Sequence, residues 1–323
     1  MCTSVRFTSK NGSMYLGRNL DWSCGYGERV RVMPKGFLVR YRFLDDAPSA
    51  HAVIGMCVDF QNLPMFFDCG NDAGLAVAGL NFPGFAEYAE GPAETGRNVC
   101  AYELPMWIAA NFSSVDEVVA ALEGTTVVGV PAGEGLGVSY LHWIVGDATR
   151  SLVIECRADG MHVLDDPVDV LANQPSLEWH LENLRGYITA TSDAPAPVKW
   201  RRAELAPYGA GAGMRGIPGD SYSPSRFVKA AFLNANYPDK EGEHDNVIRM
   251  FRTLEGVAMV EGSTRMTNGD LEKTLYTSCF SAETGCYYYN TYEDLAIRCV
   301  SLADAEGAPV DKLVCPDPVR IDG

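Results

Sequence analysis

The first twenty residues predict a β-hairpin, and this hairpin limits how the rest of the chain can be arranged. Two runs that read as β-strands, Met1–Phe7 and Met14–Leu20, flank the turn sequence Lys10-Asn11-Gly12-Ser13. An Asn-Gly pair between two such runs is a strong signal for a tight turn between antiparallel strands. The second strand then returns toward the start of the first, so we expect Asp21 to lie close to Cys2.

Cys2 is a candidate nucleophile. A cysteine in the second position becomes the first residue once the initiator methionine is removed, and it then carries both a thiol and a free α-amino group. Near neutral pH such an amine is partly unprotonated and can take the proton of the adjacent sulfur. This is the arrangement of an N-terminal nucleophile, in which one residue supplies both nucleophile and base.

Arg18 and Asp21 are the candidate partners of Cys2. The carboxylate of Asp21 can accept hydrogen bonds from the α-amino group, and the permanent charge of Arg18 favours the thiolate. Residues three apart in a strand face opposite sides, so we expect a bend at Asn19. The alternative is that Cys2 is an ordinary small second residue and that Arg18 and Asp21 form a surface pair. From these two segments alone, that alternative is favoured.

Charge and hydropathy exclude two classes of partner. The chain has 323 residues and a formal net charge of −16, so a polyanion such as nucleic acid would be repelled. No apolar run approaches the roughly 20 residues of a membrane-spanning helix, and Arg6 and Lys10 interrupt any signal-peptide core at the start. We therefore expect a cytoplasmic protein with no nucleic-acid or membrane partner.

The sequence predicts no metal site. It contains neither a CxxC pair nor an HExxH sequence, which are the usual signals for zinc. The ten cysteines are scattered through a long chain, so we expect most of them to be reduced. Residues 211–216 match the dinucleotide pattern GxGxxG, but no apolar strand precedes them and Pro218 follows where a helix would begin.

Predicted strands dominate both ends of the chain, and predicted helices lie mostly between them. After the hairpin, the expected strands are Arg29–Met33, Phe37–Phe43, His51–Val58, Leu75–Leu80, Val138–Val145, Leu152–Cys156, Val168–Ala172, Thr274–Phe280, Cys286–Tyr292 and Ala296–Leu302. The expected helices are Tyr102–Ala110, Val115–Leu122, Leu177–Leu184, one opening at Ser223, and Asp245–Leu254. The glycine-rich stretch 207–223 reads as a long loop rather than a linker, because composition does not shift across it.

Three further polar residues are candidates for a site. Asn81 and Asn173 lie at predicted strand ends, where their amides could stabilise the oxyanion formed during acyl transfer. Arg226 lies in the first turn of a helix that Ser223 is expected to cap with Pro224 at its first position. The helix dipole disfavours a cation there by about 0.3–1 kcal/mol, which hints at a role. The alternatives are turn-forming asparagines and an arginine that meets a nearby carboxylate.

Two other interpretations rest on less specific residues. A cysteine–histidine protease would pair one of His142, His162 and His180 with one of Cys69, Cys100 and Cys156. No local signature marks these residues, and we expect them to be ordinary buried side chains. An apolar acyl pocket could be lined by Trp22, Tyr26, Phe60 and Phe82, although aromatic residues near strand ends more often belong to the core.

Five segments occur together in one order and spacing: Cys2, Arg18–Trp22, Gly79–Pro83, Asn173–Pro175 and Ser223–Phe227. In this combination the chain resembles the choloylglycine hydrolase family, which contains bile salt hydrolases and penicillin V acylases. The resemblance extends from Met1 to at least Leu302. It implies an α+β fold, the αββα sandwich of N-terminal nucleophile hydrolases, with two stacked antiparallel sheets flanked by helices in a single domain over residues 1–323.

The resemblance also implies the site residues. The expected catalytic set is Cys2, Arg18, Asp21, Asn81, Asn173 and Arg226. With asparagine at position 81, the chain resembles the bile salt hydrolase branch of the family, since penicillin V acylases usually carry tyrosine there. Leu20 lies where relatives place an apolar residue of the substrate pocket.

The implied reaction is hydrolysis of the amide that joins a bile acid to glycine or taurine, through a thioester on Cys2 and without a metal or organic cofactor. Penicillin V acylase is the nearest alternative, and a non-catalytic binding module on the same fold is another. Family members are typically homotetramers, so we expect the extended loop over residues 187–222 to contribute to assembly.

Overall fold

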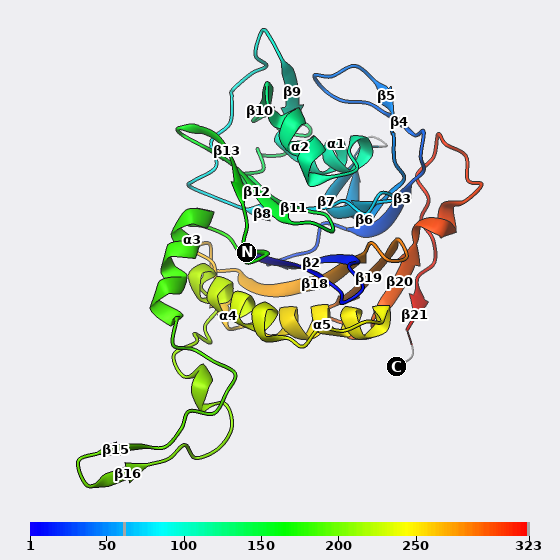
Figure 1. Cartoon of the computed structure of the whole chain (residues 1–323). Helices are drawn as coiled ribbons and strands as arrows, with labels where there is room; N and C mark the ends of the chain where they lie inside the picture. The colour runs from blue at the N-terminus through cyan, green and yellow to red at the C-terminus, as the bar shows by residue number, and fades with distance from the viewer. Residues whose placement is uncertain (61–62, 322–323) are drawn as a thin grey trace.

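The computed structural model describes residues 1–60 and 63–321, which form an αββα sandwich (Figure 1). Two sheets stack face to face. Helices α4 (Ser223–Asn236) and α5 (Glu243–Glu255) cover the outer face of one sheet. Helices α1 (Leu104–Asn111) and α2 (Val115–Leu122) cover the outer face of the other. The predicted fold class is confirmed.

The sheet that contains Cys2, here the Cys2 sheet, has the strand order β14 (Val170–Leu171), β1 (Cys2–Thr8), β2 (Met14–Trp22), β18 (Leu271–Ser281), β19 (Cys286–Thr291), β20 (Arg298–Ser301) and β21 (Val319–Arg320), and β17 (Thr264–Arg265) pairs with β18. The Asn81 sheet has the order β13 (Gly160–Asp165), β12 (Ser151–Arg157), β11 (Leu141–Gly146), β8 (Ala76–Asn81), β7 (Leu63–Asn71), β6 (Val53–Phe60) and β3 (Arg29–Met33). Neighbouring strands within both sheets are antiparallel.

Shorter elements complete the chain. They are the strand pairs β4 (Leu38–Val39) with β5 (Ala47–Pro48), β9 (Arg97–Cys100) with β10 (Thr125–Val128), and β15 (Val198–Trp200) with β16 (Ala203–Leu205), together with α3 (Leu177–Asn183). Single 3₁₀ turns span Ala101–Glu103, Leu184–Tyr187, Ala212–Met214 and Leu302–Ala305.

The predicted opening hairpin is confirmed. Strands β1 and β2 pair antiparallel, with Cys2 opposite Leu20 and Thr8 opposite Met14. The turn places Gly12 at φ 88°, a left-handed conformation that glycine adopts without steric cost. The hairpin therefore delivers the end of β2 to the first residues of the chain.

The sequence-based assignment overextended one strand and missed nine, which are β7, β13 and the shorter β5, β9, β10, β15, β16, β17 and β21. Strand β7 went unassigned because Pro64 and Gly70 are unusual inside a strand, and β13 because it is a largely exposed edge strand. The strand expected over residues 37–43 is reduced to Leu38–Val39, because only the two-residue strand β5 pairs with it. The other predicted elements are present, with ends shifted by a few residues.

The sandwich has two apolar clusters. One fills the space between the sheets and continues under α4 and α5, with Val5, Leu16 and Phe280 among its members. The other lies between the Asn81 sheet and α1, with Val77 and Trp107 among its members. Polar residues buried within the first cluster consequently lie in a largely apolar surrounding.

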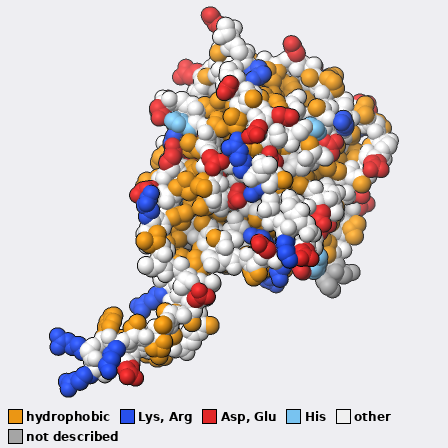
Figure 2. Space-filling view, in the orientation of Figure 1, with side chains coloured by type: hydrophobic (Ala, Val, Ile, Leu, Met, Phe, Trp, Pro, Cys, Tyr) orange, Lys and Arg blue, Asp and Glu red, His pale blue; other side chains and the backbone are white. Residues whose placement is uncertain are grey.

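Residues 187–222 form an arm that projects from the body of the molecule (Figure 1). The arm carries the β15/β16 hairpin, whose residues are exposed on both strands. Its tip combines Lys199, Arg201 and Arg202 with Trp200, which is 72% exposed, on an otherwise acidic molecule (Figure 2). Within the described residues, no helix combines the length and apolar character that a membrane crossing requires.

Candidate active site

Cys2 lies at the start of β1 with its thiol directed into the space between the sheets. Nη2 of Arg18 lies 2.7 Å from Sγ of Cys2, and both residues are buried. The same guanidinium donates through Nη1 to the main-chain oxygens of Gly79 (2.7 Å) and Phe67 (3.2 Å) in the Asn81 sheet. Burial opposes the charge of Arg18, but the Cys2 sulfur and the buried Tyr276, Asp68 and Tyr287 outweigh this effect and raise the pKa of Arg18. A permanent cation therefore faces the sulfur.

The bend expected at Asn19 is absent. Strand β2 continues unbroken from Met14 to Trp22, and the irregularity lies instead in β18, between Thr274 and Tyr276. Asn19 and Asp21 face the helices, as shown by the bond from Asn19 to the oxygen of Leu254 in α5. Arg18 faces the other sheet. No bend is required because Cys2 presents its sulfur to one face of the sheet and its main-chain atoms to the other.

Asp21 is a buried carboxylate with an open acceptor. Its Oδ1 atom accepts a hydrogen bond from Oγ1 of Thr274 at 2.6 Å, whereas Oδ2 has no hydrogen-bond partner within the described chain. The nearest cation is Arg226, whose Nη1 lies 3.9 Å from Oδ2. Burial raises the pKa of Asp21, and Arg226 and the chain terminus oppose that rise. Thr274 was not anticipated from sequence, since nothing local marks it.

The structure retains Met1 ahead of Cys2. The terminal amine of Met1 donates to the main-chain oxygen of Asp21 at 2.5 Å and to the carboxylate of Glu272. The nitrogen of Cys2 is therefore an amide here, and it donates to Oδ1 of Asn173 at 2.7 Å. Cleavage of the Met1–Cys2 peptide bond would convert this nitrogen into a primary amine beside Asp21 and Asn173.

Asn173 joins three separate segments of the chain. Its Oδ1 atom accepts from the nitrogen of Cys2 and from Nη2 of Arg226 at 2.6 Å, and its Nδ2 atom donates to the main-chain oxygen of Asn81 at 2.7 Å. Because both partners of Oδ1 can only donate, the orientation of the amide is fixed. Its main-chain nitrogen donates to Oγ of Ser223 at 3.0 Å.

Arg226 lies in the first turn of α4 and is 1% exposed. Its Nη1 atom donates to the main-chain oxygen of Cys2 and to Oγ1 of Thr3, both at 2.5 Å. Cys2 and Thr3 thus stabilise the guanidinium of Arg226 at a helix end where the dipole disfavours a cation. Ser223, expected as the helix cap, is instead the first residue of α4 and makes no cap bond; its hydroxyl serves Asn173.

Asn81 is the last residue of β8 and is half-buried. Its main-chain oxygen accepts from Asn173, while its side-chain amide makes no hydrogen bond within residues 1–60 and 63–321. The structure therefore brings all six expected catalytic residues into one connected group, and leaves the amide of Asn81 available to a ligand.

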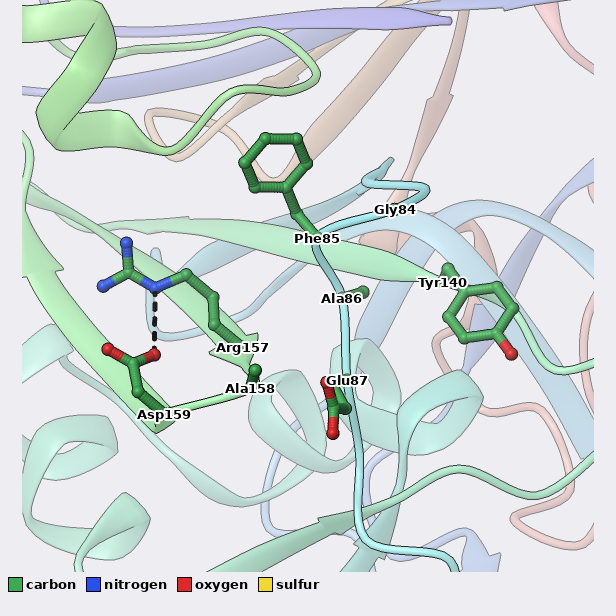
Figure 3. Close-up of a pocket in the computed structure, with 8 residues that line it drawn as sticks. All are labelled: Gly84, Phe85, Ala86, Glu87, Tyr140, Arg157, Ala158 and Asp159. Atoms are coloured by element: carbon green, nitrogen blue, oxygen red, sulfur yellow. Dashed lines mark ion pairs between the residues drawn. The ribbon is translucent and has the colours of Figure 1, made fainter.

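The expected pocket residues are less closely grouped. Leu20 is buried opposite Cys2, Trp22 is half-buried at the end of β2, and Tyr26 is 52% exposed against the ring of Phe67. The ring of Phe60 lies against Gly133, where an added Cβ would meet it at 2.0 Å. A cavity of about 470 Å³ near the Asn81 end of the sheet (Figure 3) is lined instead by Gly84, Phe85, Ala86, Glu87, Tyr140, Arg157, Ala158 and Asp159.

The geometry gives no support to a cysteine–histidine pair. His142 and His180 bond to main-chain oxygens, and His162 bonds to Asp159 at 2.8 Å. Burial raises the pKa of Cys100 and of Cys156 to about 12. None of these histidines forms a hydrogen bond with one of the three candidate cysteines within the described chain.

Comparison with known proteins finds one family of amide hydrolases over nearly the whole chain. The family described as linear amide C–N hydrolases, choloylglycine hydrolase family, matches residues 2–317. A bile salt hydrolase/transferase of Bifidobacterium longum subsp. longum is 50% identical over 307 residues, 94% of this chain and 96% of that protein. A conjugated bile acid hydrolase of Lactobacillus gasseri is 41% identical over 315 residues, 97% of this chain and 99% of its own length.

Solved structures agree with this relationship. The R18L variant of a conjugated bile acid hydrolase from Clostridium perfringens superposes with a TM-score of 0.89 at 32% identity, covering 99% of this chain and 97% of that one. A penicillin V acylase from Agrobacterium tumefaciens has a TM-score of 0.74 at 18% identity, with 93% and 86% covered, so it shares the fold.

Proposed function

Because this chain belongs to the choloylglycine hydrolase family of linear amide C–N hydrolases, we propose that it cleaves the amide bond joining a bile acid to glycine or taurine. Relatives of up to 50% identity over nearly the whole chain carry the names bile salt hydrolase/transferase and conjugated bile acid hydrolase. The observation that carries the proposal is the environment of Cys2. Its sulfur lies 2.7 Å from Arg18, and its nitrogen is held by Asn173, whose other Oδ1 partner Arg226 lies 3.9 Å from the open carboxylate oxygen of Asp21.

The first step requires removal of Met1, which frees the α-amine of Cys2. The amine takes the thiol proton, Arg18 stabilises the resulting thiolate, and Asp21 holds the amine in place. The thiolate then attacks the carbonyl carbon of the amide, and the negative charge moves to the carbonyl oxygen. Asn173 uses one of its two N–H donors on the oxygen of Asn81, so the second remains for the oxyanion.

The tetrahedral intermediate collapses when the carbon–nitrogen bond breaks. The α-ammonium of Cys2 gives its proton to the departing nitrogen, which leaves as the amine of glycine or taurine. The bile acid stays behind as a thioester on the sulfur. Water then attacks the thioester, the α-amine accepts a proton from that water, and the free bile acid leaves with the thiol restored. These steps call on no metal or organic cofactor.

Leu20, Trp22, Tyr26 and Phe60 are the side chains we assign to the steroid. Leu20 lies directly opposite Cys2 in the hairpin, which places an apolar surface next to the nucleophile. Burial of a steroid against such side chains contributes roughly 25 cal/mol for each Å² of apolar surface removed from water. The apolar steroid can therefore supply most of the binding free energy of an anionic conjugate, although the chain is acidic.

Turnover of three amides by one preparation tests the proposal. We expect taurocholate or glycocholate to be cleaved with a higher kcat/KM than penicillin V, and the Cys2→Ser variant to be inactive toward all three. Faster cleavage of penicillin V would assign the chain to penicillin V acylase activity. Folded protein that cleaves none of them, although its N-terminal thiol reacts with iodoacetamide, would indicate a binding module.

We further propose a single-domain cytoplasmic homotetramer. The arm over residues 187–222 exposes Ile188, Trp200 and Tyr208 at its surface, and such apolar groups are normally covered in an assembly. Light scattering of the native protein and of a variant carrying Trp200→Ser and Tyr208→Ser tests whether the arm holds the tetramer together. The variant is expected to dissociate, and an unchanged tetramer would assign assembly to another surface.

A further inference from the structure

Two buried histidines hold the main chain of Asn173. Nε2 of His142 lies 2.8 Å from the main-chain oxygen of Ala172, and Nε2 of His180 lies 3.0 Å from that of Asn173 itself. Both imidazoles are 0% exposed. Consecutive carbonyl groups of one segment are thus fixed by side chains from two different elements, strand β11 and helix α3.

Each imidazole also stacks on an aromatic ring next to a proposed catalytic residue. The ring of His142 lies parallel to Phe82, with centroids 4.1 Å apart and an interplanar angle of 8°. The ring of His180 lies parallel to Phe227, at 4.4 Å and 12°. Phe82 follows Asn81, and Phe227 follows Arg226. The two histidines therefore connect the segment of Asn173 to the segments of two of its three side-chain partners, Asn81 and Arg226.

The bonding pattern places a proton on Nε2 of both rings. A carbonyl oxygen can only accept, so Nε2 must carry a proton in each imidazole. Nδ1 of His180 has no hydrogen-bond partner within the described chain, and Nδ1 of His142 lies 3.5 Å from Oε1 of Glu155. Burial lowers the pKa of His180 to about 4. His180 is therefore a neutral ring that donates through Nε2.

We propose that His142 and His180 are positioning residues that hold Asn173 in register with Cys2, Asn81 and Arg226. The inference rests on the proposed role of Asn173 in stabilising the oxyanion. The side chain of Asn173 is engaged by three partners, so a small rotation of its main chain would disturb all three contacts together. The sulfur of Cys2 is held by Arg18 rather than by Asn173 or either histidine, so we expect the reactivity of the thiol to depend on the histidines much less than kcat does.

A matched pair of substitutions at each position tests this role. Glutamine can place a donor near the position of Nε2, whereas methionine has a similar size and no donor. We expect His142→Met and His180→Met each to lower kcat by about tenfold to a hundredfold with KM within about twofold, because small displacements of catalytic groups cost rates of that order. The glutamine variants should recover most of kcat. Iodoacetamide modification of Cys2 should slow far less than kcat in all four, because Arg18 rather than Asn173 contacts the sulfur.

The role is refuted if methionine and glutamine give equal kcat at both positions, or if the loss appears only in KM or in the melting temperature. His162→Gln, which alters a half-buried histidine bonded to Asp159, serves as the unaffected control. The assay uses whichever of taurocholate, glycocholate and penicillin V the wild type cleaves fastest, so the proposed substrate can fail while the inference is still tested.

Hydrogen exchange provides a readout that needs no substrate. Amides of residues 172–177 should exchange faster in His180→Met than in His180→Gln at equal global stability. Equal exchange in the two variants would overturn the inference even if the wild type cleaved none of the three amides.

Discussion

Nη2 of Arg18 and Sγ of Cys2 are 2.7 Å apart in a site where Arg18 is 1% exposed and Cys2 is 4% exposed. A charge pair shielded from water interacts more strongly than one at the surface. The sulfur therefore meets a cation whose effect solvent does not dilute. The guanidinium is itself oriented by two carbonyl groups of the opposite sheet, so the stacking of the sheets fixes the direction of the charge.

Replacement of Arg18 should reduce the reactivity of Cys2. We expect Arg18→Gln to slow iodoacetamide modification of the N-terminal peptide at pH 7 by at least about tenfold, because the thiolate loses its cation. Arg18→Lys should be intermediate, since an ammonium keeps the charge without reaching all three acceptors. Peptide mapping distinguishes Cys2 from the exposed thiols of Cys24 and Cys315. An unchanged rate in Arg18→Gln would remove Arg18 from the mechanism.

Asp21 should affect catalysis more than stability. Asp21→Asn keeps a side-chain oxygen for Thr274 but removes the charge beside the amine of Cys2. We expect kcat to fall by about a hundredfold or more, the usual range for loss of an oriented acid–base group, with a melting temperature within a few degrees of wild type. Steady-state kinetics and calorimetry check both expectations. Retention of more than half the activity would show that the amine is held by another group.

A second buried carboxylate should govern stability instead. Asp68 is 3% exposed and accepts hydrogen bonds from the hydroxyls of Tyr276, Ser278 and Tyr287 at 2.6, 2.8 and 2.5 Å. Asp68→Ala leaves these donors unpaired near Arg18 and should cost about 3–5 kcal/mol in urea unfolding. Tyr287→Phe removes one donor and should cost about 1 kcal/mol. Equal losses in the two variants would contradict this account.

The burial of His180 predicts a pH-dependent stability. The folded chain lowers the pKa of His180 from 6.5 to about 4, so the unfolded chain binds a proton that the folded chain does not. The contribution of His180 to the free energy of unfolding is fully present above about pH 6.5. It is lost as the pH falls toward 4, and the total loss is about 3 kcal/mol. Urea unfolding of wild type and His180→Gln between about pH 4 and pH 7 isolates this contribution. Parallel curves for the two proteins would contradict it.

The sequence predicted the parts of the site whose signals are local. The Asn-Gly turn and alternating β-rich runs predict the hairpin that brings Asp21 to Cys2, and the misplaced cation at Arg226 indicated a role for that residue. Thr274 was missed, and Ser223 was expected only as a helix cap, because they meet their partners across separations of 253 and 50 residues, which no local pattern encodes. The prediction of a bend at Asn19 was wrong because it placed the partner of the Cys2 sulfur and the partner of the Cys2 nitrogen on the same face of the strand.

Intact-mass measurement of the purified protein, before and after rapid acid quench with excess taurocholate, tests the central claim most directly. The account predicts a starting mass lower by one methionine residue, and a transient species heavier by one cholyl group located on the N-terminal peptide and absent from Cys2→Ala. Full activity in protein that retains Met1, or a cholyl group on any other residue, would contradict it.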